Sequence, residues 1–196
     1  YVINTCTVTH IGDRKSRQII RRAVRQNPQA VVLVTGCYAQ VAAREVAAIP
    51  GVNLVIGTEC RDDLVELAEK SIANGRVQVV VPDIETAKCF EELPGLAAYP
   101  GGVRALLKIQ EGCREFCTYC IVPYARGPLR SRLPENIMQF AQSAVDKGYR
   151  EIVLTGTILG AYGRDLGDYN LAHAVNSLAQ IPGLQRLRLS SIEPGE

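Results

Sequence analysis

Short apolar runs alternate with helical segments through the first part of this 196-residue chain. The runs are rich in Val, Ile and Leu, as in strands buried on both faces, and cover residues 1–4, 30–35, 52–56 and 77–81. Between them, helical periodicity marks residues 13–26, 40–49 and 60–73, with Thr58 a candidate N-cap for the last. This alternation predicts a mostly parallel sheet with flanking helices.

The alternation stops in a segment rich in Pro and Gly and then resumes. Further strands are expected at residues 103–110, 151–154 and 186–190, and helices at 134–147 and 171–180. Pro134 suits the first position of a helix, and Gly148 suits the position just after one. We therefore predict an α/β protein. It would have an open parallel α/β sheet domain at 1–81, a linker at 82–102 and the first part of a β/α partial barrel at 103–196.

The amino-acid composition limits which classes of function are possible for this chain. No apolar run reaches membrane length, so we expect no membrane partner. Seven cysteines are an odd number and mostly stand in metal-like contexts, which favours a reducing cytoplasm over a disulfide framework. A net charge of +2 is too small to indicate a polyanionic partner by itself. The chain starts inside a strand-like run and its only methionine is Met138, so we expect it to be truncated at both ends.

Three cysteines, Cys113, Cys117 and Cys120, follow the first strand of the second half. A structural zinc ion wants four protein ligands, whereas a 4Fe–4S cluster held by three thiolates leaves one iron open for a substrate or cofactor. The loop falls at the carboxyl end of a strand, where barrel active sites lie. A zinc site remains the alternative, with a fourth ligand among Cys60, Cys89, His10 and His173.

Two more cysteines, Cys6 and Cys37, each follow an apolar strand directly. The carboxyl ends of neighbouring parallel strands meet at one edge of a sheet, so these two thiols can share a metal. Both could equally be small buried hydrophobic residues, as free cysteines often are. Cys60 and Cys89 are interpreted as incidental.

The spacing of the three-cysteine motif, with Tyr119 before its last cysteine, resembles that of the radical S-adenosylmethionine (SAM) enzymes. The flanking stretches Lys108-Ile-Gln-Glu-Gly-Cys113 and Ile121-Val-Pro-Tyr-Ala-Arg-Gly127 match as well. This resemblance implies a 4Fe–4S cluster on the three cysteines, whose free iron binds SAM. The implied SAM contacts are Tyr119 by the adenine, Thr155 and Gly156 at the amino group, and Ser190 and Glu193 at the ribose or methionine.

Three stretches of the first half resemble the N-terminal domain of the radical SAM methylthiotransferases. They are Asn4-Thr-Cys-Thr-Val-Thr9, Asp13-Arg-Lys-Ser-Arg-Gln18 and Thr35-Gly-Cys-Tyr-Ala-Gln40. The resemblance implies a second 4Fe–4S cluster on three cysteines, two of which match Cys6 and Cys37. The third would lie upstream of Tyr1 and is missing here.

Within this family, the closest resemblance is to the branch that modifies N6-threonylcarbamoyladenosine in tRNA. It rests on Gly36-Cys-Tyr-Ala-Gln40, Leu154-Thr-Gly-Thr-Ile-Leu-Gly-Ala-Tyr-Gly163 and Leu187-Arg-Leu-Ser-Ser-Ile-Glu-Pro194, with Ile158 a departure where a polar residue is expected. The implied reaction is methylthiolation at C2 of the adenine, with a flavodoxin- or ferredoxin-like protein as electron donor. The alternatives are isopentenyladenosine in tRNA, a ribosomal-protein aspartate, or a non-catalytic electron carrier or zinc- or iron–sulfur-stabilised RNA-binding module.

Arginines supply candidate contacts to tRNA. Arg14, Arg17, Arg21 and Arg25 are spaced about one helical turn apart, as in a basic stripe or a solvated helix face. Arg126, Arg130 and Arg132 follow the cysteine loop and could hold the SAM carboxylate or an RNA phosphate, or form a solvated basic loop.

Overall fold

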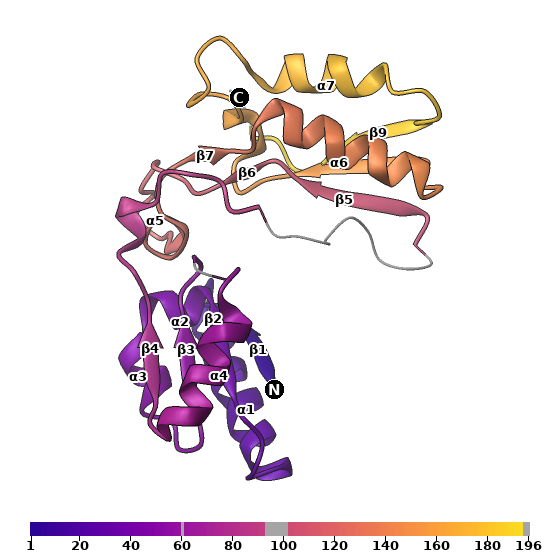
Figure 1. Ribbon diagram of the computed structural model, residues 1–196. Coiled ribbons are helices and arrows are strands. Elements are labelled where there is room, and N and C mark those ends of the chain that lie inside the picture. The colour runs from indigo at the N-terminus through magenta and orange to yellow at the C-terminus, as the bar shows by residue number, and fades with distance from the viewer. Residues whose placement is uncertain (60, 93–101, 194–196) are drawn as a thin grey trace. The chain divides into compact units, whose positions relative to one another are not determined.

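The computed structural model describes residues 1–59, 61–92 and 102–193 (Figure 1). The chain divides into two compact units. The first unit comprises Tyr1–Ala87 together with Glu115–Gly127, and the second comprises Lys88–Arg114 together with Pro128–Glu196. The later part of the cysteine loop therefore packs with the N-terminal sheet, although it follows the second unit's first strand in sequence.

The first unit is built on a four-stranded sheet in which each pair of neighbouring strands is parallel. Its order is β1 (Val2–Thr5), β2 (Leu33–Gly36), β3 (Leu54–Ile56) and β4 (Gln78–Val80). The helices are α1 (His10–Gln26), α2 (Cys37–Val41), α3 (Ala43–Ala47), α4 (Leu64–Asn74) and α5 (Val122–Arg126), with a 3-10 turn η1 (Ile84–Thr86). The parallel α/β arrangement expected from the alternation is confirmed.

Both faces of this sheet are covered, as its apolar strands require. On one face, Val34 and Val55 pack with Ile20 of α1 and Val46 of α3. On the other, Leu54 and its neighbours pack against Leu64, Leu67 and Ala68 of α4. The central strands β2 and β3 are consequently buried along their whole length.

Two local predictions in the first unit are wrong. The helix expected at 40–49 is two short helices that begin directly at Cys37 and are separated by Ala42, whose φ of −125° is not helical. Thr58 caps no helix, because its hydroxyl is buried and donates to the Ala125 carbonyl at 3.0 Å. Helix α4 begins later, at Leu64.

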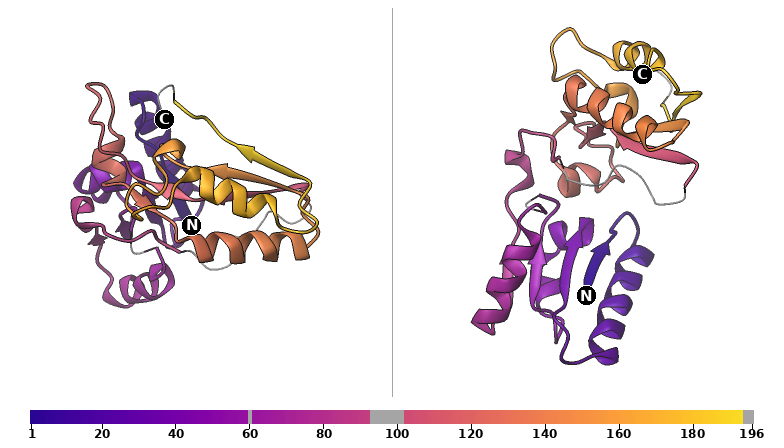
Figure 2. Two further views of the ribbon diagram at one scale, coloured as in Figure 1. Left: turned by 90° about the horizontal axis from the view of Figure 1, so that it is seen from above. Right: turned by 45° about the vertical axis from the view of Figure 1, so that its right-hand side comes forward.

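The second unit contains a three-stranded parallel sheet in the order β5 (Arg104–Lys108), β8 (Glu151–Thr155) and β9 (Arg186–Leu189). Its helices are α6 (Pro134–Asp146) and α7 (Leu171–Ala179), with a 3-10 turn η2 (Leu159–Ala161) (Figure 2). Pro134 opens α6 and Gly148, with φ +93°, follows its end, as expected. A short antiparallel pair, β6 (Gln110–Glu111) with β7 (Arg130–Ser131), was not anticipated and frames the cysteine loop in the sequence.

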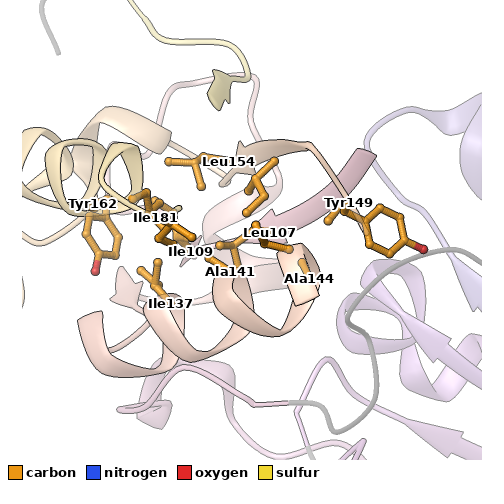
Figure 3. Close-up of a cluster of buried hydrophobic side chains, with 14 of the residues drawn as sticks. Leu107, Ile109, Ile137, Ala141, Ala144, Tyr149, Leu154, Tyr162 and Ile181 are labelled. Atoms are coloured by element: carbon orange, nitrogen blue, oxygen red, sulfur yellow. The ribbon is translucent and has the colours of Figure 1, made fainter. Parts of the chain in front are cut away.

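One hydrophobic core holds the second unit together (Figure 3). Leu107 and Leu154 from the sheet pack with Ile137 and Ala141 of α6, all of them almost completely buried. The fully buried Tyr162 donates its hydroxyl to the Arg132 carbonyl at 2.9 Å. Burial raises the pKa of Tyr162, so the phenol stays protonated and remains a donor.

Truncating this core has a predictable cost. Replacing Leu154 by alanine should lower the free energy of unfolding by about 2–5 kcal/mol, because it removes a fully buried side chain and leaves a cavity. Chemical denaturation of the chain measures the change. Leu106 on the neighbouring strand is 50% exposed, so Leu106→Ala is the matched control and should cost far less. Equal destabilisation by the two variants would contradict this packing.

Candidate metal centre

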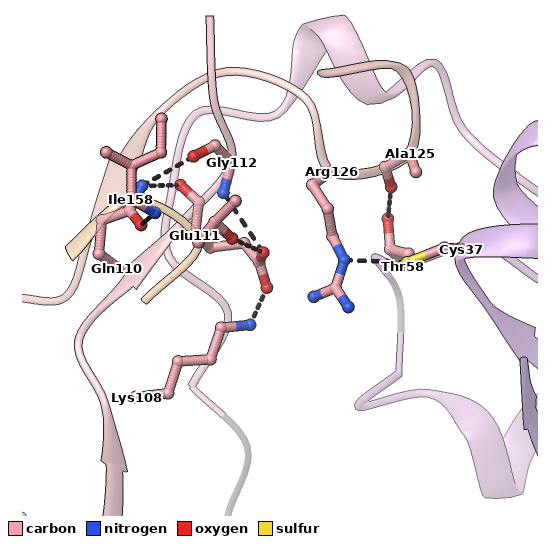
Figure 4. Close-up of polar contacts among 10 residues, drawn as sticks. Cys37, Thr58, Lys108, Gln110, Glu111, Gly112, Ala125, Arg126 and Ile158 are labelled. Atoms are coloured by element: carbon pink, nitrogen blue, oxygen red, sulfur yellow. Dashed lines mark hydrogen bonds and ion pairs between the residues drawn. The ribbon is translucent and has the colours of Figure 1, made fainter. Parts of the chain in front are cut away.

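A buried amide, Gln110, organises the chain just before Cys113. Its Nε2 donates to the carbonyl oxygens of Glu111 and Gly112 at 2.9 and 2.8 Å, and its Oε1 accepts from the Ile158 N–H at 2.7 Å (Figure 4). The side chain thus ties the strand leading to Cys113 to the loop that follows β8. The contact at Ile158 uses its backbone, so it does not depend on that side chain.

The carboxylate of Glu111 reinforces the same region. It accepts from the Thr157 hydroxyl at 2.9 Å and from the Gly112 N–H at 3.3 Å, and it forms an ion pair with Lys108. A buried carboxylate is tolerated when hydrogen bonds and a counter-charge compensate its missing hydration, and Glu111 has both. Cys113, itself buried, therefore follows a backbone held on two sides.

Cys117 and Cys120 lie on a turn in the first unit. The Cys120 N–H donates to the Cys117 carbonyl at 2.8 Å, which brings the two ends of Cys-Thr-Tyr-Cys together. Cys117 is exposed and Cys120 is half-buried. Tyr119, between them, is 89% exposed, so it does not serve core packing and its ring is available to a ligand.

Cys6 and Cys37 lie at the same edge of the first sheet, the one formed by the carboxyl ends of its strands, as predicted. In the β1–β2 register Thr5 is opposite Gly36, so the two cysteines are the next residues on adjacent parallel strands. Gly36 has φ +96°, and a Cβ there would lie 2.3 Å from the Thr5 carbonyl oxygen. Glycine is therefore required beside Cys37, which is buried, whereas Cys6 is exposed.

Arg126, the last residue of α5, contacts Cys37 directly. Its Nε donates to the Cys37 Sγ at 3.0 Å (Figure 4). We expected this arginine to hold the SAM carboxylate or an RNA phosphate; the structure directs its Nε at the thiol, and the expected contact stays a prediction.

The donor set fits iron–sulfur chemistry. Among the described residues, no three His, Cys, Asp or Glu side chains are arranged as a ready-made ion site. Six cysteines are free thiols, and Cys60 lies outside the described residues. His173 serves as a capping residue of α7, its Nδ1 accepting from the Asn170 N–H at 3.3 Å. Thiolates are the protein ligands of iron–sulfur clusters, so the chemistry of these donors fits such a cluster.

A pocket of about 970 Å³ opens in the first unit beside this sheet edge. The hydroxyl of its lining residue Tyr38 accepts from Arg17 at 2.8 Å and donates to Glu45, also in the lining, at 3.0 Å. Burial raises the pKa of Tyr38, and the hydrogen bond from Arg17 to Tyr38 raises the pKa of Arg17. The lining comes from three segments: residues 7–10 with Asp13, residues 38–45 without Ala39, and Tyr119 with Ile121.

The residues predicted to contact SAM in the second unit lie at strand ends. Thr155 ends β8 and its carbonyl accepts from the Ile109 N–H at 2.9 Å. Gly156 follows it, where a Cβ would come within 2.9 Å of the Gln110 Oε1. The Ser190 N–H, just beyond β9, donates to the Leu154 carbonyl at 3.0 Å, and Glu193 is exposed. Their roles toward SAM stay predictions.

The α1 arginines divide into two groups. Arg14, Arg21 and Arg25 are exposed, on the side away from the buried Ile20 and Ala23. These three remain candidates for phosphate contacts. Arg17 is half-buried and is occupied by Tyr38, as described above.

Two of the arginines after the cysteine loop, Arg130 and Arg132, have side chains that lie mostly inside the second unit. Arg132 makes a two-point contact with Glu92, at 2.7 Å from Nε and 2.5 Å from Nη2. Its guanidinium also lies over the rings of Phe90 and Phe140, at 5.9 and 5.2 Å from their centres. Arg130 is only 4% exposed. Arg132 is therefore held by contacts within the second unit, and Arg130 is buried there.

Two family descriptions match the chain. Residues 1–57 match "Uncharacterized protein family UPF0004", and residues 107–193 match the "Radical SAM superfamily". The chain also resembles a solved radical SAM methyltransferase, TsrM of Kitasatospora setae, with a TM-score of 0.54 at 20% identity over 89% of this chain and 38% of that one. That likeness supports the fold alone. Residues 107–193, which include the cysteine loop, thus define the chain as a radical SAM protein.

Curated relatives narrow the class. Among them are two proteins named threonylcarbamoyladenosine tRNA methylthiotransferase MtaB. The Bacillus subtilis protein is 51% identical over 100% of this chain. The Aquifex aeolicus protein is 46% identical over 98% of this chain. A tRNA-2-methylthio-N(6)-dimethylallyladenosine synthase of Rickettsia canadensis is 35% identical over 98%. The chain covers 44%, 46% and 46% of these three proteins, somewhat under half of their length. It belongs to the radical SAM methylthiotransferase family, as its motifs indicated.

Membership of this family implies SAM and, in the full-length enzyme, two 4Fe–4S clusters as cofactors. Within the part of the chain that the structure describes, no helix is both long enough and apolar enough to span a bilayer.

The Gln110 network gives a direct test of the cysteine loop. Gln110→Leu should leave the buried Gly112 carbonyl and the partly buried Ile158 N–H without this partner, at up to about 1–3 kcal/mol for each group. We expect lower thermal stability and less iron per chain after anaerobic reconstitution. Gln142→Leu is the matched control, because that amide contacts Asp146 at the exposed surface of α6. Full iron incorporation in Gln110→Leu would show that the network does not hold the loop.

Proposed function

We propose that the protein to which this chain belongs methylthiolates C2 of N6-threonylcarbamoyladenosine beside the anticodon of tRNA. The observation that carries the proposal is the three-thiol loop at the end of a parallel strand, in a chain that is 51% identical to a protein named for that activity. The chain spans under half of that relative, so the activity is proposed for the whole protein.

The cysteines have separate roles in this proposal. Cys113, Cys117 and Cys120 would hold the cluster that binds SAM, and Cys6 with Cys37 would supply two ligands of the second cluster. When bound, these cofactors supply the reductive cleavage of SAM and the transfer of a methylated sulfur, and an external flavodoxin- or ferredoxin-like protein supplies the electron.

The chain's other residues bind and orient. Gln110 and Glu111 hold the backbone that enters the cysteine loop, which keeps Cys113 in register with the loop after β8. The exposed ring of Tyr119 would stack on the adenine of SAM. Thr155 and Gly156 would meet the SAM amino group, and Ser190 and Glu193 its ribose or methionine.

The tRNA contact is proposed for the exposed face of α1. Arg14, Arg21 and Arg25 present three guanidinium groups along one helix, a spacing that suits successive phosphates. Arg130 and Arg132 are left out of this surface because of burial and the Glu92 contact.

Dimethylallyladenosine, the same nucleoside as isopentenyladenosine, is the second candidate substrate. Relatives named for that modification are 35% identical over almost the whole chain. Both candidates are adenosines modified at N6, so the two proposals differ in the pocket that accepts the N6 substituent and not in the cluster chemistry.

Nucleoside analysis should decide between them. Mass spectrometry of tRNA from cells lacking the full-length gene should show loss of 2-methylthio-N6-threonylcarbamoyladenosine and accumulation of its unthiolated precursor. Complementation with the wild-type gene or with Cys89→Ala should restore the product, because Cys89 is exposed and outside both cysteine sets. Cys117→Ala should not restore it. Loss of the dimethylallyl derivative alone would favour the second candidate, and zinc without iron in the purified enzyme would contradict both.

A second experiment tests the basic face of α1. Combined Arg21→Gln and Arg25→Gln should weaken tRNA binding by the full-length enzyme. It should also lower the slope of log affinity against log salt by about 0.7–0.9 for each phosphate that the variant no longer neutralises. Binding is measured by filter or fluorescence titration at several salt concentrations. SAM cleavage without RNA should be unchanged.

The matched control for this charge removal is Arg76→Gln. Arg76 is exposed and precedes β4, at the opposite edge of the sheet from Cys6 and Cys37. The control removes one charge where the tested variant removes two. An equal decrease of the slope per charge removed would assign the effect to net charge and contradict a defined arginine surface.

A further inference from the structure

We propose that Arg126 is a positioning residue that acts through the sulfur of Cys37. Its hydrogen bond would raise the reduction potential of the cluster that Cys37 helps to hold. This inference rests on the proposed function, because it takes Cys37 to be a cluster ligand.

The hydrogen bond itself is short and shielded. The Arg126 Nε lies 3.0 Å from the Cys37 Sγ, the thiol is only 8% exposed and the arginine is half-buried. Arginine keeps its charge at every physiological pH, so the sulfur faces a permanent positive donor. A hydrogen bond in such partly dry surroundings is stronger than one in water.

The backbone on both sides of Arg126 is held in place. The preceding carbonyl, of Ala125, accepts the buried Thr58 hydroxyl at 3.0 Å. The following residue, Gly127, has φ +67°, and a Cβ there would come within 2.4 Å of the Ile84 carbonyl oxygen. Two independent contacts within the first unit therefore aim the guanidinium at Cys37.

Hydrogen bonds to ligand sulfurs are one of the main means by which a protein sets the potential of an iron–sulfur cluster. A donor with positive charge stabilises the reduced cluster more than the oxidised one, because reduction adds negative charge. Arg126 also lies only six residues after Cys120, on the segment that packs with the first unit. The segment that carries two of the SAM-cluster cysteines thus also supplies a donor to a cysteine of the other set.

The test isolates the second cluster in the full-length enzyme. Replacing Cys113, Cys117 and Cys120 by alanine together removes the first site, and anaerobic reconstitution then loads only the second. Arg126→Gln, Arg126→Lys and Arg76→Gln are added separately to this background. Iron per chain, the EPR spectrum of the reduced cluster and its midpoint potential in a redox titration are measured for each.

We expect a lower midpoint potential and an altered EPR spectrum in Arg126→Gln. Arg126→Lys should give a smaller shift, since it keeps the charge without the Nε donor, and Arg76→Gln should give none. Gly127→Ala should shift the potential in the same direction as Arg126→Gln, because it displaces an intact Arg126 from the thiol. Circular dichroism identifies any variant that fails to fold, and the remaining variants then carry the comparison.

The failures are distinguishable. If the triple-alanine background binds iron but Arg126→Gln and Gly127→Ala leave the potential unchanged, the role of Arg126 is overturned and the proposed function stands. If that background binds no iron while the unmodified enzyme holds a single cluster, Cys37 is not a ligand. The inference then falls together with the two-cluster part of the proposed function.

Discussion

Parallel strand pairing is the constraint on which both cysteine sets depend. A parallel pair places both carboxyl ends at the same edge, so whatever follows β1 and β2 must meet. Cys6 and Cys37 occupy those positions directly. In the second unit the same rule puts the start of the cysteine loop at Cys113, the turn after β8 and the residues after β9 at one edge of their sheet. Antiparallel pairing in either sheet would send alternate loops to the opposite edge.

Strand direction determines the positions of these loops only approximately, and buried polar side chains fix them more closely. Gln110 satisfies two carbonyls and one N–H with a single amide, so the approach to Cys113 cannot relax without leaving polar groups unpaired. Arg132 illustrates the other use of a polar group. Its pairing with Glu92 and two aromatic rings fastens residues 90–92 to α6 and its approach.

Much of this architecture could be predicted from the sequence, because buried parallel strands read as apolar runs and helices as periodic ones. The strands, the longer helices and the shared edge of Cys6 and Cys37 were recovered in this way. Thr58 was misjudged because its hydroxyl is used by Ala125, which is remote in sequence. Two other contacts also join residues that are remote in sequence, and no local pattern predicts them. They are Arg126 with Cys37 and Arg132 with Glu92. The pairing of β6 with β7 was missed because two-residue strands leave no periodicity.

The packing of residues 115–127 with the N-terminal sheet bears on how such proteins can be recombined. A crossover placed in the part of the 82–102 linker after residue 87 looks harmless in the linear sequence. It would nevertheless separate Ala125, Arg126 and Gly127 from the Thr58, Cys37 and Ile84 that they contact. Hybrids of two family members joined there should inherit mismatched surfaces unless the loop is exchanged together with the first 87 residues. The unit that must be exchanged as a whole is therefore discontinuous along the gene.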